Sequence, residues 1–167
     1  MWIIESEADQ LLIEARIHAP PVSVKQVANS LGIKIELADL GEDCSGVLVR
    51  NGDRAVIGVN KKHHPNRQRF SIAHEIGHFM LHEGDTYIDK GYRVQFRDLE
   101  SGSGTKGEEM DANAFAAALL MPAEWVKDAF YQQPFDLTED YVLEMLAEKF
   151  KVSTQAMSYR LMRLRLL

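Results

Sequence analysis

The feature that most constrains this chain is a His-Glu-x-x-His pattern at residues 74–78. In a helix, His74 and His78 are one turn apart and project from the same face, where two imidazoles can bind one metal ion. Glu75 lies about 100° round the helix from His74, beside such an ion and outside its coordination shell. Because a carboxylate there can take a proton from metal-bound water, the pattern predicts a hydrolytic metal site.

The composition is that of an ordinary globular domain. The chain has 167 residues, of which 46% are hydrophobic and 26% charged, enough for one domain with a substantial core. No signal peptide or membrane span is visible, and the lone Cys44 excludes an intramolecular disulfide, so we expect a cytoplasmic protein with no membrane partner. The net charge of −6 argues against direct nucleic-acid binding. The alternative is that the N- or C-terminal helices bind DNA.

Hydrophobic periodicity divides the chain into helices, strands and helices again. We expect N-terminal helices, a sheet, the motif helix and a helical C-terminal part, over residues 6–31, 33–60, 66–83 and 108–165, in a single domain of residues 1–167. A period of two begins at Ile33, and the turn Asn51-Gly52-Asp53 separates two apolar runs. The fold class is therefore α+β, with a small antiparallel sheet packed against the motif helix and a mostly helical C-terminal half.

The expected helix caps give the first boundaries. Ser6 is expected to cap the first helix, and Ser23 to form a capping box with Gln26 at the start of the second. The basic residues that follow Glu148 are expected to form a solvated helix face.

Two histidines leave the metal site incomplete, because a catalytic zinc usually has three protein ligands and an open position. His82 lies about 12 Å from His74 along the helix axis, too far to share an ion. The remaining candidates come from a later helix: Glu100, Glu108 and Glu109. We favour Glu109, because Asn113 lies one turn further on the same face and could accept the imidazole N–H that does not face the metal. The alternative for Asn113 is a buried amide bonded to the backbone.

The chemistry of this ligand set favours Zn²⁺ as the cofactor. Two imidazoles and one carboxylate leave zinc with a net positive charge, so its bound water ionises near neutral pH and the ion polarises a carbonyl. Glu75 would accept the proton of that water and hand it to the leaving amine. An accidental match on a helix face is the alternative explanation of the motif.

Two segments of the chain resemble the ImmA/IrrE family of bacterial and phage metallopeptidases. They run from Arg67 to His78 and from Glu109 to Pro122. The resemblance implies a zincin-like fold with a gluzincin-like zinc site, in which His74, His78 and Glu109 are the ligands and Glu75 is the catalytic base. It also implies a protein substrate, a helix-turn-helix repressor of the XRE type often encoded beside the protease. The resemblance further implies that cleavage of this repressor relieves repression in a mobile element or stress response.

Two matters stay open in the sequence. A non-catalytic or antitoxin-like regulatory protein with the same fold is the alternative function, and it predicts that surface changes at Arg160 or Arg163 abolish activity while Glu75→Gln does not. The proton donor of the family is not evident. The candidates, which are near the motif in sequence only, are Tyr87, Tyr92, His63 and His64.

The stretch from Gly84 to Gly107 is expected to be a long loop or lid with a short strand.

Overall fold

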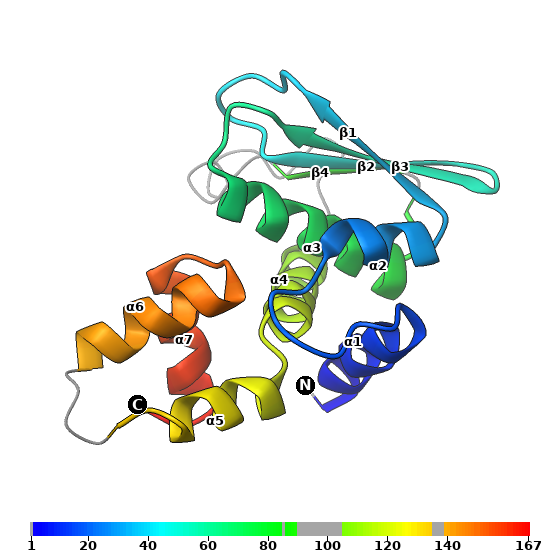
Figure 1. Ribbon diagram of the computed structural model, residues 1–167. Helices are drawn as coiled ribbons and strands as arrows, with labels where there is room; N and C mark the ends of the chain where they lie inside the picture. Colours follow the sequence, from blue (N-terminus) through cyan, green and yellow to red (C-terminus); the bar gives the residue numbers. More distant parts are fainter. Residues whose placement is uncertain (1, 85, 90–104, 135–138) are drawn as a thin grey trace.

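A computed structural model of the chain describes residues 2–84, 86–89, 105–134 and 139–167. In chain order its elements are α1 (Trp2–Glu14), α2 (Val24–Ser30), β1 (Ile33–Ala38), β2 (Gly46–Asn51), β3 (Arg54–Asn60), α3 (Pro65–Leu81), β4 (Thr86–Asp89), α4 (Lys106–Leu120), α5 (Ala123–Tyr131), α6 (Glu139–Phe150) and α7 (Thr154–Arg163). Figure 1 shows α2 and α3 along one face of the sheet, α4 beyond α3, and α5 to α7 farther away. The α+β class with a mostly helical C-terminal half is confirmed.

The sheet is mixed, and the expectation of an antiparallel sheet was wrong in this respect. The strand order in the described part of the chain is β1-β3-β2-β4. β2 pairs antiparallel with β3 and β4, whereas β1 pairs in parallel with β3. The predicted turn joins β2 to β3, and Gly52 within it has a φ of 58°.

Burial explains why β1 and β2 do not pair although they are neighbours in the sequence. Ile57 and Val59 of β3 are fully buried, which suits the position of this strand between β1 and β2. β1 carries Lys34 and Glu36, which form an exposed ion pair and suit an edge position. The parallel pairing therefore follows from the tertiary position of β3 and not from the local pattern of β1.

Several helix ends differ from the predicted ones. α1 begins at Trp2, so Ser6 lies inside the helix and does not cap it. The Ser23 hydroxyl does accept from the Gln26 backbone N–H at 3.3 Å, but the Gln26 side chain donates to the Ala15 carbonyl at 2.7 Å. The expected capping box is therefore half formed, because a tertiary partner takes the glutamine side chain.

The complete capping box lies at the start of α4. Thr105 and Glu108 exchange side-chain and backbone hydrogen bonds there. The Thr-x-x-Glu spacing that signals this cap was present in the sequence and was missed. The motif helix also starts one residue earlier than predicted, at Pro65, with the His64 imidazole accepting from the Asn66 N–H at 3.2 Å.

The core is built around α3, which contacts the sheet on one side and α4 on the other. Fully buried side chains come from the first helix, the sheet, α3, α4 and α7, and include Leu11, Leu48, Ile57, Ile76, Phe115 and Leu161. The middle of α3, from Ser71 to His78, is buried throughout. A polar motif therefore lies inside the molecule, where each of its polar groups needs a partner. Among the described residues, no helix has the length and apolar character that a membrane span requires.

Arg160 is buried, although the sequence suggested a basic solvated face at this end of the chain. Its side chain is 1% exposed and donates two parallel hydrogen bonds to the Glu5 carboxylate, at 2.6 and 2.8 Å. Its Nε–H also donates to the Met121 carbonyl at 2.9 Å. The ion pair joins α7 to α1 across almost the whole length of the chain, so Arg160 has a structural role.

We expect Glu5→Gln to lower the free energy of unfolding by about 2 kcal/mol at pH 7, because it leaves the buried Arg160 charge without its carboxylate. The Arg160 hydrogen bonds lower the pKa of Glu5 below its ordinary 4.5, against partial burial, which raises it. A lowered folded-state pKa means that the stabilisation is complete above about pH 4.5 and is lost as the pH falls through the lowered value.

Denaturant unfolding of the wild type and of Glu5→Gln between pH 7 and pH 3 measures this contribution. The difference in unfolding free energy should be largest at pH 7 and should shrink below about pH 4.5. Glu7→Gln is the matched control, since Glu7 is exposed on the same helix. A difference between wild type and Glu5→Gln that does not change with pH would contradict the assigned role of the pair.

Candidate metal centre

Helix α3 presents His74 and His78 from one face, as their spacing predicts. Their side chains are 3% and 1% exposed, and their Nε2 atoms lie 3.1 Å apart. Two neutral imidazoles approach this closely when one Nε2–H donates to the other Nε2, or when both nitrogens face one metal ion. The pair is therefore placed as a pair of metal ligands would be.

Helix α4 brings Glu109 to the two histidines. Its Oε2 lies 3.3 Å from the Nε2 of His74, and its Oε1 lies 3.2 Å from the Nε2 of His78. The three residues offer ligand atoms that all lie within 4.8 Å of one another, and the group could hold a metal ion. The structure thus brings together the three ligands that the sequence predicted.

A close contact between α3 and α4 makes this convergence possible. A Cβ atom on Gly77 would lie 3.0 Å from the Cα and 3.1 Å from the carbonyl oxygen of Ala112. A side chain at this position would require the α4 backbone to shift by a few tenths of an ångström, and glycine avoids this shift. Because Glu109 precedes Ala112 by less than one turn, the distance between the helices at Gly77 determines how closely Glu109 can approach the histidines.

Asn113 lies one turn beyond Glu109 and contacts His74 on its other side. The Asn113 Oδ1 is 3.1 Å from the His74 Nδ1. An amide oxygen only accepts, so the Nδ1 of His74 carries a hydrogen, and in the neutral ring the Nε2 is the nitrogen that can bind a metal ion. This is the tautomer that a metal ligand requires, and the alternative of a purely backbone-bonded amide is not what the structure shows.

The protonation states also suit a cation. Burial lowers the pKa of His78, and the nearby His74 acts in the same direction, so the imidazole stays neutral at physiological pH. Burial opposes ionisation of Glu109, but hydrogen bonds and charge interactions with His74 and His78 outweigh it and bring the pKa of Glu109 to about 2. Neutral imidazoles and an ionised carboxylate are the forms that bind metals. A donor set of two histidines and one carboxylate suits Zn²⁺ and leaves one tetrahedral position open.

Glu75 is fully buried next to the first residue of β2. A Cβ atom on Gly46 would lie 2.9 Å from the Oε1 of Glu75, so the absence of a side chain at Gly46 leaves space for the carboxylate. The sequence reasoning missed Gly46. A glycine at the start of a strand is the signal that could have found it, because it often marks a close approach.

The other residues singled out in the sequence lie elsewhere. The Glu108 carboxylate accepts from the Thr105 N–H at 2.6 Å, within the capping box. His82 is outside the group of three, and its Nε2 lies 3.2 Å from the Glu108 carbonyl oxygen. Glu100 and Tyr92 fall outside the described residues.

Tyr87 is a proton-donor candidate whose ring contacts that of His78, a candidate ligand. β4 carries it, in the short strand predicted within the 84–107 stretch, and its ring stacks on that of His78 with centroids 4.2 Å apart. Its hydroxyl accepts from the Gly84 N–H at 3.0 Å. The tyrosine ring therefore stacks on the face of the His78 ring, an arrangement that holds the His78 ring in place.

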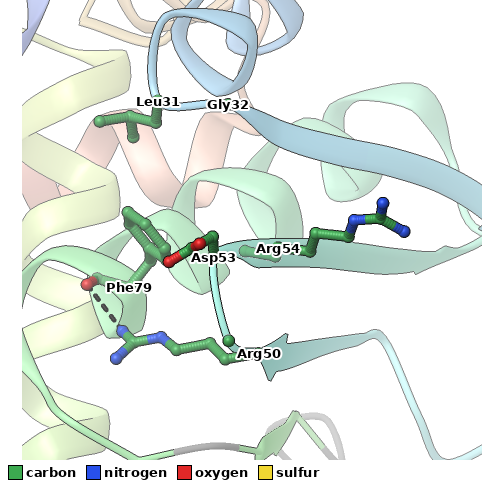
Figure 2. A pocket seen from close by; sticks show the side chains of 8 residues that line it. Leu31, Gly32, Arg50, Asp53, Arg54 and Phe79 are labelled. Carbon is green, nitrogen blue, oxygen red and sulfur yellow. Dashed lines mark hydrogen bonds between the residues drawn. The ribbon is translucent and has the colours of Figure 1, made fainter.

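A cavity of about 170 Å³ lies at the C-terminal end of α3 and not at the three candidate ligands (Figure 2). Its lining residues are Leu31, Gly32, Arg50, Gly52, Asp53, Arg54, Ala55 and Phe79. Figure 2 shows Arg50 reaching the Phe79 carbonyl beside it, while Arg54 points away. None of these residues is a candidate ligand, so this cavity is separate from the candidate metal centre.

A family comparison agrees with the donor set. Residues 28–162 match the profile of the peptidase M78 family, described as the IrrE N-terminal-like domain. The chain belongs to this family. The match confirms the resemblance carried by the two motif segments, and membership of peptidase M78 indicates a metalloprotease.

One curated protein and one solved structure resemble this IrrE-like chain. Over 74 residues it is 40% identical to the radiation response metalloprotease IrrE of Deinococcus deserti (strain DSM 17065 / CIP 109153 / LMG 22923 / VCD115), covering 44% of this chain and 25% of that protein. A Mycobacterium tuberculosis transcriptional regulator has a similar fold, with a TM-score of 0.64, 17% identity, and coverage of 96% of this chain and 47% of that one. The chain spans about a quarter of the first protein and half of the second, and the second likeness concerns the fold alone.

We predict that Gly77→Ala weakens zinc binding by about tenfold or more, because the added methyl group pushes the α4 backbone, and Glu109 with it, away from the histidines. Zinc affinity is measured by competition with a chromophoric chelator. Gly107→Ala is the matched control, since a Cβ there meets nothing nearer than 3.8 Å. The control should bind zinc as the wild type does and be slightly more stable. Equal zinc affinities in both variants would show that the close contact does not position Glu109.

Proposed function

We propose that the chain is a zinc-dependent endopeptidase, with His74, His78 and Glu109 as zinc ligands and Glu75 as the catalytic base. The observation that carries the proposal is the convergence of these three side chains in the interior of a chain that belongs to a metalloprotease family. A buried cluster of two imidazoles and a carboxylate has no evident packing function, because apolar residues would fill the same space without a desolvation cost.

Each residue around the two histidines and Glu109 has its own role in the proposed reaction. When bound, a zinc ion supplies a Lewis acid and a water of lowered pKa. Asn113 holds His74 in the required tautomer, and Tyr87 fixes the plane of the His78 ring by stacking on it. Glu75 accepts a proton from the attacking water and delivers it to the leaving amine nitrogen. Gly46 keeps the space in which the Glu75 carboxylate lies.

The substrate we propose is a helix-turn-helix transcriptional repressor of the XRE type, whose cleavage relieves repression in a mobile-element or stress-response circuit. The family supports a protein substrate. The name of the Deinococcus relative, a radiation response metalloprotease, supports a stress-response setting for that protein. The resemblance to ImmA/IrrE peptidases supports a repressor encoded by the adjacent gene as the first substrate to test.

We expect Glu75→Gln to retain zinc and to cleave the adjacent-gene repressor at least about 100-fold more slowly than the wild type, because a general base contributes about 10²–10⁴ in rate. Metal analysis gives the zinc content, and electrophoresis of the incubated repressor gives the cleavage rate. Glu83→Gln is the matched control, since Glu83 is an exposed glutamate just beyond the same helix. Undiminished cleavage by Glu75→Gln would refute the assigned role.

The same experiment separates the enzyme from a non-catalytic regulator with this fold. A regulator that only binds its partner would keep its biological activity in Glu75→Gln. The surface test first considered for that alternative, substitution of Arg160, is unsuitable because Arg160 is buried and paired with Glu5. Arg163 is exposed at the end of α7 and remains usable for it.

A further inference from the structure

The C-terminal end of α3 is held by one arginine from the sheet. The Nη2 group of Arg50, on β2, lies within hydrogen-bond distance of the carbonyl oxygens of His78, Phe79 and His82, at 3.1, 2.7 and 2.8 Å. Its guanidinium carbon lies 4.8 Å from the centroid of the Phe79 ring, and Figure 2 shows the contact with the Phe79 carbonyl. The last carbonyls of a helix lack intrahelical partners and carry partial negative charge, so a cation here fixes the final turn.

The side chain of His82 extends this connection to α4. Its Nε2 lies 3.2 Å from the Glu108 carbonyl oxygen. A carbonyl only accepts, so the Nε2 of His82 donates the hydrogen. His82 thus receives a hydrogen bond from Arg50 at its own carbonyl and donates one from its ring to the residue before Glu109.

This contact lies where α4 has few other buried contacts with the described residues. Thr105, Lys106 and Gly107 are exposed at the start of the helix, whereas the fully buried packing of α4 begins at Ala112. Glu109 stands between the exposed turn and the buried part. Its position therefore depends on the Gly77–Ala112 contact on one side and on the His82–Glu108 hydrogen bond on the other.

We propose that Arg50 and His82 are positioning residues of the metal centre, a pair that we term the Arg50–His82 clamp. Arg50 fixes the last turn of the helix that carries both histidines, and His82 fixes the turn of α4 that carries Glu109. The clamp sets the separation of the two halves of the site without contributing a ligand. This inference rests on the proposed function, in which the two histidines and Glu109 bind zinc.

The test compares His82→Phe, which keeps a ring but removes the donor, with His82→Gln, whose amide N–H can reach the same carbonyl. The zinc dissociation constant is measured by chelator competition. We expect about a tenfold or greater loss of affinity in His82→Phe and a loss of no more than about threefold in His82→Gln. His18→Phe is the control, since His18 is exposed between α1 and α2.

A double-mutant cycle distinguishes positioning from a general structural role. If His82 acts through Glu109, His82→Phe no longer changes zinc affinity when Glu109→Ala is already present. A merely structural residue would weaken zinc binding by the same factor in both backgrounds. That result, or an affinity of His82→Phe within about twofold of the wild type, would overturn the clamp.

Arg50→Lys tests the other half and serves if metal-free His82→Phe does not fold. Lysine keeps the charge but not the planar guanidinium, so we expect a loss of zinc affinity of about threefold or more that depends on Glu109 in the same way. Unchanged affinity in Arg50→Lys would overturn the role of Arg50. A wild-type chain that binds no zinc would instead overturn the proposed metal centre itself, and the clamp with it.

Discussion

The close packing of α3 against α4 is the contact on which the candidate metal centre depends. Gly77 and Ala112 meet at backbone distance, and a single added methyl group would separate them. This approach brings two side chains of α4 to the histidines. Glu109 reaches both imidazoles, and Asn113 reaches the opposite side of His74. One glycine in α3 therefore couples the packing of the core to the geometry of the ligands.

The interior position of the site has an energetic consequence. Buried charged and polar groups are stable only when they are paired, and here the ionised Glu109 lies beside two imidazoles. The His74 ring contacts the Asn113 amide, and the His78 ring stacks on Tyr87. The same surroundings that would make an isolated carboxylate costly make a cation favourable. The core and the site are therefore not separate parts of this molecule, because the helix that carries the motif is also the helix around which the sheet and α4 pack.

Much of the fold was predictable where the pattern is local. The motif helix, the turn between β2 and β3 and the helical C-terminal half follow from hydrophobic period and turn residues, and the structure has them close to the expected bounds. The parallel pairing of β1 with β3 was not predictable, because strand order depends on which strand is buried on both faces. Arg160 was misjudged for a related reason, since its partner Glu5 lies at the other end of the chain.

By itself, the sequence determined which residues the candidate metal site offers: two histidines one helical turn apart, a glutamate beside them, and a downstream Glu-x-x-x-Asn pair. Helical geometry is fixed by the backbone, so residues on one helix can be placed from spacing alone. Only the tertiary structure decided what joins different elements. The Gly77–Ala112 contact, the space that Gly46 leaves for Glu75, and the link from Arg50 through His82 to α4 each depend on chain segments far apart in sequence. No local period records such contacts, because they arise from packing and not from the conformation of any one segment.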